Sequence, residues 1–153
     1  MRWLHGALAL CLCAASVAQA QIRIGQTAGF SGPVAAGVQE TTDGAKLWFD
    51  AVNAKGGING AKIELVSLDD KFEPKLAGEN AKKLAADPRI VSLFLTRGTP
   101  HAQAMMPVLA EAKIPLVGPS TGAMVLHEPV NPWVFNVRAT YQREAERAVM
   151  HMA

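Results

Sequence analysis

One stretch of the chain decides the fold: 90-IVSLFLTRGTPHAQAMMPVLAEAKIPLVGPSTG-122. Residues 90–95 are almost all apolar, which is typical of a strand whose two faces are both covered in a parallel sheet. A helix is predicted over residues 101–112, because apolar side chains recur there at helical spacing, at Met105, Val108, Leu109 and Ala112. A second strand follows over residues 114–117. The stretch therefore predicts a strand–helix–strand unit with parallel strands.

The same alternation extends in both directions along the chain. Further strands are expected over residues 22–25, 63–68 and 133–137, and further helices over residues 40–53, 74–86 and from residue 142 onward. In the first of these helices, the side chains expected to face the sheet are Ala45, Trp48, Phe49 and Val52. Short strands separated by helices pair in parallel through crossovers. The predicted fold class is therefore α/β, with a doubly wound parallel sheet.

The composition excludes several classes of protein. Half of the 153 residues are apolar, too many for a disordered chain, and two cysteines cannot make a disulfide-rich scaffold. The net charge is only +2 and no basic run is present, so no nucleic-acid partner is expected.

The first twenty residues have the pattern of a secretory signal peptide. A short basic start precedes an uncharged apolar run over residues 8–17, and Ala18-Gln19-Ala20 has the small-x-small pattern of a cleavage site. We expect cleavage after Ala20, which removes Cys11 and Cys13 and exports residues 21–153 to the periplasm. The alternative, a membrane anchor, is disfavoured because the apolar run is far shorter than the ~20 residues that span a bilayer.

Candidate ligand-binding residues follow from the fold class. In such sheets, ligands bind beyond the carboxyl ends of the strands, which here precede the loops 29–33, 96–100, 118–122 and 138–141. Hydroxyl side chains and glycines gather in two of these loops, at Gly98, Thr99, Ser120, Thr121 and Gly122. Helices that start after such loops favour an anion, so a carboxylate ligand is expected. The alternative is that Thr99 and Ser120 serve only as helix N-caps.

Motifs for catalysis and metal binding are sparse. No P-loop or G-x-G-x-x-G is present, and the histidines lack metal-ligand spacing, so neither a cofactor nor a metal site is expected. His101, His127 and His151 are expected at the surface or at helix ends, and Asp69-Asp70 is expected to cap a loop. Residues 118–122 do fit G-x-S-x-G, which leaves a secreted serine hydrolase using Ser120 as an alternative. A catalytic acid and histidine on later strands are lacking, which disfavours it.

Several motifs, in order along the chain, resemble one known family. They are Ser31-Gly32-Pro33-Val34-Ala35, Ala54-Lys55-Gly56-Gly57-Ile58-Asn59-Gly60, Asp69-Asp70 followed by Pro74, Gly98-Thr99, and the loop 119–123. Together they are similar to the type I periplasmic binding proteins of branched-chain amino-acid ABC transporters. The resemblance implies two lobes joined by a hinge, a small carboxylate or amino acid held between them, and delivery to a membrane permease. It implies a receptor and not an enzyme.

The resemblance also assigns roles to residues. The first lobe is expected to hold the ligand through Thr99 and through residues 120–122. Two departures from the family pattern are Gly122, where a threonine is usual, and Gly37, where an aromatic residue is usual. Both argue against assigning branched-chain specificity. Arg97 is expected either to pair with a second carboxylate or to be a solvated loop arginine, and Tyr141 either to stack on the ligand or to cover the sheet edge.

The length bears on the domain organisation that the resemblance implies. Family members run to well over three hundred residues, so residues 21–153 are expected to form an incomplete N-terminal lobe of a fragmentary chain, without the second lobe. Such a lobe is expected to bind its ligand weakly or not at all by itself. A sensory ligand-binding domain of the same fold remains the other functional alternative.

Overall fold

The computed structural model describes residues 21–152, so the expected signal peptide lies outside the described residues. The strands are β1 (Gln21–Ala28), β2 (Lys62–Asp69), β3 (Ile90–Phe94), β4 (Leu116–Val117) and β5 (Val134–Phe135). The helices are α1 (Ala35–Ala54), α2 (Pro74–Ala85), α3 (Thr99–Ala112), the short 3-10 helix η1 (Met124–Leu126) and α4 (Tyr141–Met152). All the predicted strands and helices are present, with different ends.

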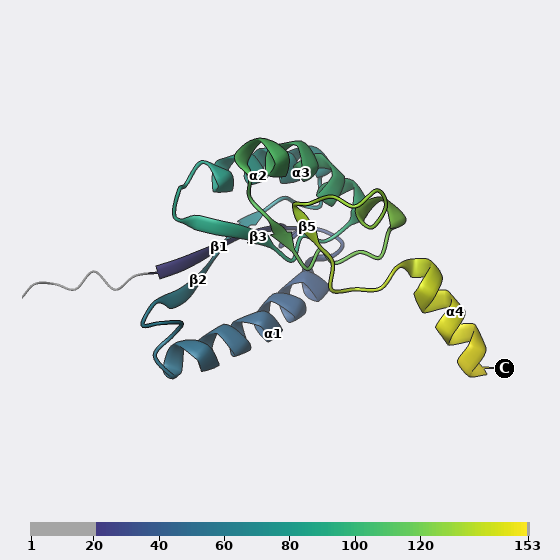
Figure 1. Ribbon diagram of the computed structural model, residues 1–153, viewed down its shortest axis with the longest axis horizontal. Helices are drawn as coiled ribbons and strands as arrows, with labels where there is room; N and C mark the ends of the chain where they lie inside the picture. The colour runs from purple at the N-terminus through teal and green to yellow at the C-terminus, as the bar shows by residue number, and fades with distance from the viewer. Residues whose placement is uncertain (1–20, 153) are drawn as a thin grey trace, which may run out of the picture.

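The strands form a single parallel sheet in the order β2-β1-β3-β4-β5. Helix α1 lies on one face of the sheet, and α2 and α3 cover the other face (Figure 1). The predicted fold class, a doubly wound α/β sheet, is confirmed. In this strand order the chain leaves β1 and β3 toward opposite faces, and the crevice between them is where ligands bind in such folds.

The hydrophobic core lies between the sheet and the pair α2 and α3. Its centre is fully buried and is made by Leu93, Met105, Leu109 and Leu116. The stretch 90–122 that predicts the fold thus supplies most of this core. The expected cover of both faces of β3 is incomplete, since Val91 is 55% exposed. The prediction for Ala112 is wrong, since this last residue of α3 is exposed.

Helix α1 differs most from its prediction. It begins at Ala35, five residues earlier than expected, and buries Val38 and Thr42 in its first turns. These extend a stripe through Ala45, Phe49 and Val52. Phe49 packs on Phe94 of β3, with ring centroids 5.9 Å apart. Trp48 was predicted to face the sheet and is 70% exposed, because it lies one residue, about 100°, off this stripe.

The last part of the described chain is less packed. Only the 3-10 helix η1 separates β4 from β5, although the two strands still pair in parallel. Helix α4 projects from the rest of the molecule and has no buried residue (Figure 1). Among residues 21–152, no helix has the length and apolarity required to span a membrane.

Candidate ligand-binding site

The loops after β3 and β4 run side by side at the carboxyl edge of the sheet. The Ser120 amide donates a hydrogen bond to the Thr96 carbonyl, with a distance of 2.8 Å between nitrogen and oxygen. Arg97 and Ser120 form an isolated parallel bridge beyond the ends of the two strands. The two loops that the sequence predicts as ligand-binding are therefore brought together.

Three hydroxyl groups form a connected chain at this edge, which we call the hydroxyl cluster. The Thr99 and Thr121 hydroxyl oxygens are 2.7 Å apart, and the Thr121 oxygen is 3.0 Å from the Tyr141 phenol oxygen. Thr121 is buried, with 1% of its surface exposed, whereas Tyr141 is 45% exposed. The cluster thus joins a buried hydroxyl to groups that solvent or a ligand can reach.

The surroundings of Tyr141 lower the pKa of its phenol. The hydrogen bond with Thr121 is the main cause that holds the pKa of Tyr141 below its ordinary value. The Arg138 guanidinium acts in the same direction and lies 5.0 Å from the centre of the Tyr141 ring. Arg138 is itself bound by both carboxylate oxygens of Glu144, at 2.6 and 2.7 Å.

The alternative role of the threonine and serine as helix N-caps does not fit the geometry. Gly98 is the residue that precedes α3, and no side chain caps that helix end. Thr99 is already helical, and its hydroxyl is bonded to Thr121. Ser120 precedes no helix, since η1 begins at Met124.

The two candidate glycines have backbone roles. Gly98 has φ +100°, a conformation that side chains rarely adopt, and a Cβ there would lie 2.7 Å from Nδ1 of His101. A Cβ at Gly122 would lie 2.6 Å from the Ala139 carbonyl oxygen and 2.9 Å from the Tyr141 nitrogen. The Tyr141 amide donates to the Gly122 carbonyl at 2.8 Å. Gly122 therefore allows the segment that carries Tyr141 to approach the cluster.

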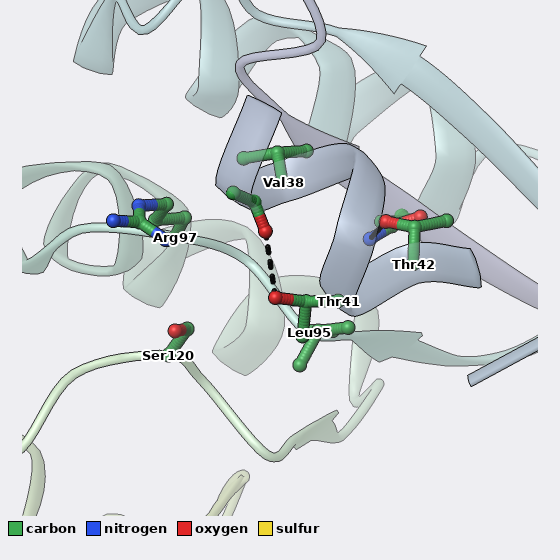
Figure 2. Close-up of a pocket in the computed structure, with 8 residues that line it drawn as sticks. Val38, Thr41, Thr42, Leu95, Arg97 and Ser120 are labelled. Carbon is green, nitrogen blue, oxygen red and sulfur yellow. Dashed lines mark hydrogen bonds between the residues drawn. The ribbon is translucent and has the colours of Figure 1, made fainter. Parts of the chain in front are cut away.

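A small hollow lies beside the cluster, in the crevice between β1 and β3, and we call it the Arg97 hollow. Its wall includes Gly37, Val38, Thr41 and Thr42 of α1 and the side chains of Leu95, Arg97 and Ser120. Figure 2 shows Arg97 and Ser120, from neighbouring loops, on one side of the hollow. The hollow has a volume of about 10 Å³, room for about one water molecule. It accommodates a single polar group and not a whole ligand.

Residues that sequence reasoning missed also support this edge. Gln26, on β1, donates to the Thr42 hydroxyl at 3.0 Å and accepts from Ser67 at 2.9 Å. This network fixes the first turns of α1 against β1 and β2. Gly37 stood out in the sequence only as a departure from the family pattern. Its contact with Arg97, which lies sixty positions along the chain, leaves no signal in local sequence.

Asp69 and Asp70 cap a loop, as predicted. Asp69 accepts from the Ser31 hydroxyl at 2.6 Å and the Lys71 amide at 2.8 Å, and Asp70 accepts from the Phe72 amide at 2.9 Å. Burial partly raises the pKa of Asp69, but these hydrogen bonds together hold it below its ordinary value. Burial raises the pKa of the fully buried Asp70. Residues 21–152 contain no group of three or more histidine, cysteine or acidic side chains placed to hold a metal ion.

The histidines differ in part from their prediction. His101 is at a helix end but is buried, with 2% exposed, and it stacks on Phe72 with ring centroids 4.5 Å apart. The packing of the loop after β2 against the start of α3 is a tertiary contact that local spacing does not reveal. No hydrogen bond joins the Ser120 side chain to a histidine within the described part of the chain, so the geometry gives no support to a catalytic serine.

Comparisons with known proteins agree with this arrangement. Among curated proteins, the Leu/Ile/Val-binding protein BraC3 of Rhizobium johnstonii is 37% identical over 124 residues, which cover 80% of this chain and 33% of that protein. A substrate-binding periplasmic protein from Ralstonia solanacearum is 36% identical, with a TM-score of 0.78 over 87% of this chain and 38% of that one.

A third relative was solved with its ligand. The branched-chain amino acid transporter substrate-binding protein of Streptococcus pneumoniae, in complex with isoleucine, is 28% identical, with a TM-score of 0.72 over 78% of this chain and 34% of that one. This chain thus spans about a third of the length of each of these relatives. The family model for periplasmic binding proteins matches residues 21–153. The sheet order and this match lead to one conclusion: the chain belongs to the periplasmic binding protein family.

Proposed function

We propose that this protein is the extracytoplasmic solute-binding component of an ABC importer and binds an amino acid or a related small carboxylate. The observation that carries the proposal is the hydroxyl cluster of Thr99, Thr121 and Tyr141 at the carboxyl edge of the sheet. Membership in the periplasmic binding protein family supports a solute-binding role. The Leu/Ile/Val-binding relatives support an amino acid as the class of ligand.

The site has the chemistry to hold a carboxylate. Helix α3, with 14 residues, directs its N-terminal end to this edge, where free amides and the helix dipole favour an anion. The hydroxyls of Thr99, Ser120 and Tyr141 supply further donors in the same region. Charge-assisted hydrogen bonds to a carboxylate are roughly twice as strong as neutral ones. We propose Gly98, Thr99, Ser120, Thr121 and Gly122 as the ligand-binding residues, with Tyr141 at the border of the site.

The remaining parts of the proposal follow from the family. Residues 21–153 would form the N-terminal ligand-binding lobe, and a signal peptide cleaved after Ala20 would direct it to the periplasm. The ligand would be held between this lobe and a second one, and the loaded protein would dock on a membrane permease. The role is binding and not catalysis, so Ser120→Ala is expected to leave any background hydrolysis of an ester unchanged.

A titration followed by NMR tests the proposal even if one lobe binds weakly. Leucine, phenylalanine, benzoate and glutamate are added at millimolar concentration to the isotope-labelled chain. The amides of Gly98, Thr99, Thr121 and Gly122 are expected to shift with at least one of them. Thr99→Val should weaken that binding about tenfold, whereas Ser92→Ala, a hydroxyl deletion within β3, should not. If all four amides stay in place with every ligand, the proposal is wrong.

A further inference from the structure

We propose that Arg97 binds a second carboxylate of the ligand, so that the preferred ligands are small dicarboxylic acids. This inference rests on the proposed solute-binding function and names the class of solute. Three observations on the described residues carry it: the place of the guanidinium, its lack of a partner, and the size of the hollow beside it.

The guanidinium of Arg97 occupies space that is free because residue 37 is glycine. A Cβ at Gly37 would lie 3.1 Å from Nη1, 3.7 Å from Cζ and 3.9 Å from Nη2 of Arg97. Any longer side chain at position 37 would occupy the place where the guanidinium lies. The cation is therefore packed against the first turn of α1, in the crevice between β1 and β3 where ligands bind in this class of sheet.

Among the described residues, the Arg97 guanidinium has no hydrogen-bond or ion-pair partner. Within residues 21–152, the Arg97 side chain makes no hydrogen bond or ion pair, whereas Arg23, Arg89 and Arg138 each bind a carboxylate. Arg97 is half-buried, and no acidic residue lines the hollow beside it. The acid one turn along α1, Glu40, is exposed and forms no ion pair among the described residues. None of its nitrogens is among the buried side-chain atoms without a partner in the described residues, so the guanidinium is open to solvent. A carboxylate of the ligand can therefore reach it and form charge-assisted hydrogen bonds.

The size of the Arg97 hollow argues against an apolar side chain as its occupant. Its volume of about 10 Å³ accommodates one water-sized group. A branched aliphatic group needs several times that volume. A carboxylate instead can lie over the opening, with its oxygens on the guanidinium fork and on the Ser120 hydroxyl, the two groups that Figure 2 shows on the same side.

The two anion sites are close enough for one small molecule. Arg97 is two residues before Thr99, so their Cα atoms are at most about 7 Å apart. Ser120, at the hollow, is adjacent to Thr121 of the hydroxyl cluster. A diacid of four or five carbons can therefore place one carboxylate at the cluster and the other at Arg97.

The test compares ligands that differ only in the second charge. Glutamate and glutamine, and succinate and succinamate, are titrated against the labelled full chain and against Arg97→Met, Arg97→Lys and Gly37→Phe. Arg147→Met, at an exposed arginine of α4, is the matched control. In the unmodified chain, each diacid should bind about tenfold more tightly than its monoamide, the lower end of what a charged hydrogen bond supplies.

The variants should change the ratio of diacid affinity to monoamide affinity in a defined order. Arg97→Met and Gly37→Phe should bring it close to one, Arg97→Lys should give an intermediate ratio, and Arg147→Met should leave it unchanged. Equal binding of diacid and monoamide to the unmodified chain would overturn the inference. An unchanged ratio of diacid to monoamide affinity in Arg97→Met would also overturn it. Either result would leave the solute-binding role standing. If none of the four ligands shifts an amide at the site, the solute-binding role fails and the inference fails with it.

Discussion

Tyr141 is the only tyrosine of the chain, so its phenol reports on the site without interference from another. Its bond to Thr121 links α4 to the loop after β4, and Thr121 in turn contacts the first residue of α3. At the scale of single residues, the candidate site is thus a set of side chains from three separate segments that share hydrogen bonds. Its properties can be tested one bond at a time.

Replacing Thr121 by valine should raise the pKa of Tyr141. The hydrogen bond with Thr121 is the main cause that lowers this pKa, and valine has a similar shape without the hydroxyl. The change should also cost about 1 kcal/mol of stability, because the three hydrogen bonds of the Thr121 hydroxyl, with Thr99, Tyr141 and the Ala123 amide, are lost while Tyr141 stays open to water. A pH titration followed by ultraviolet absorbance of the phenolate measures the pKa. Thr41→Val, at an exposed position of α1 in the wall of the Arg97 hollow, is the control and should leave the pKa of Tyr141 unchanged. An unchanged or lower pKa in Thr121→Val would contradict the assignment.

Asp87 offers a second test at the residue scale. Both oxygens of its carboxylate are bound by Arg89, at 2.9 Å each, and this pairing is the main cause that lowers its pKa from 3.8 to about 2. Since the pKa is depressed in the folded state, the stabilising contribution is complete above about pH 4. The stabilisation that ionised Asp87 contributes is lost as the pH falls through its folded-state pKa of about 2.

Arg89→Met should therefore raise the pKa of Asp87 and shift the loss of stability to a higher pH. Arg23 also contacts Asp87, at 2.5 Å, but it is shared with Glu64, so Arg23→Met should have the smaller effect on this pKa. Carboxyl NMR titration of the three proteins gives the comparison. A larger shift in Arg23→Met would show that the shared arginine, and not Arg89, dominates.

At the scale of elements, two glycines differ in why glycine occupies the position: one lies on an open helix surface and the other lies in close contact with backbone. Gly44 lies within α1 and a Cβ there would meet no atom within 4 Å. At Gly122, by contrast, a Cβ would lie 2.6 Å from backbone oxygen of residue 139. Gly44 thus has space for a side chain, whereas Gly122 has none.

The two alanine variants should therefore change stability in opposite directions. Gly44→Ala should stabilise the chain by about 0.5–1 kcal/mol, since alanine loses less conformational freedom in a helix than glycine. Gly122→Ala should destabilise it by about 1–3 kcal/mol, because backbone cannot move aside as a flexible side chain can. Urea denaturation followed by circular dichroism measures both. If Gly122→Ala is neutral, the segment 139–141 does not approach the loop as closely as described.

At the scale of the whole molecule, the sequence predicts the layers well and the contacts between distant segments poorly. The apolar run at 90–95 and the helical spacing that follows it are local patterns, and they predict β3, α3 and the core between them. The early start of α1 depends on burial of Val38 and Thr42 against β1, and the apposition of Gly37 and Arg97 depends on the sheet order. The proximity of Thr99 and Thr121 was predictable because strand ends meet at one edge. The bond from Thr121 to Tyr141 depends on the path of the chain after β5.

The projecting helix α4 gives a prediction for the molecule as a whole. It has no buried residue, and its last two turns expose Val149, Met150 and Met152. Only its first turn is tied down, by the Tyr141 amide on Gly122 and by the Arg138–Glu144 pair. A helix of 12 residues without tertiary packing is marginal in water. Amide hydrogens of residues 146–152 should therefore exchange nearly as fast as in an unfolded chain, while those of α2 and α3, packed on the core, should be protected by several orders of magnitude.

Hydrogen exchange followed by mass spectrometry or NMR measures this difference between helices. The experiment is repeated over a wide range of protein concentration, because exposed apolar residues can be covered by a second copy of the chain. Protection of residues 146–152 that matches α3 at every concentration would contradict the prediction, since it would require an intramolecular contact that the described residues do not make. Protection that appears only at high concentration would instead place the apolar side of α4 in an interface between copies, with the helix marginal in the single chain.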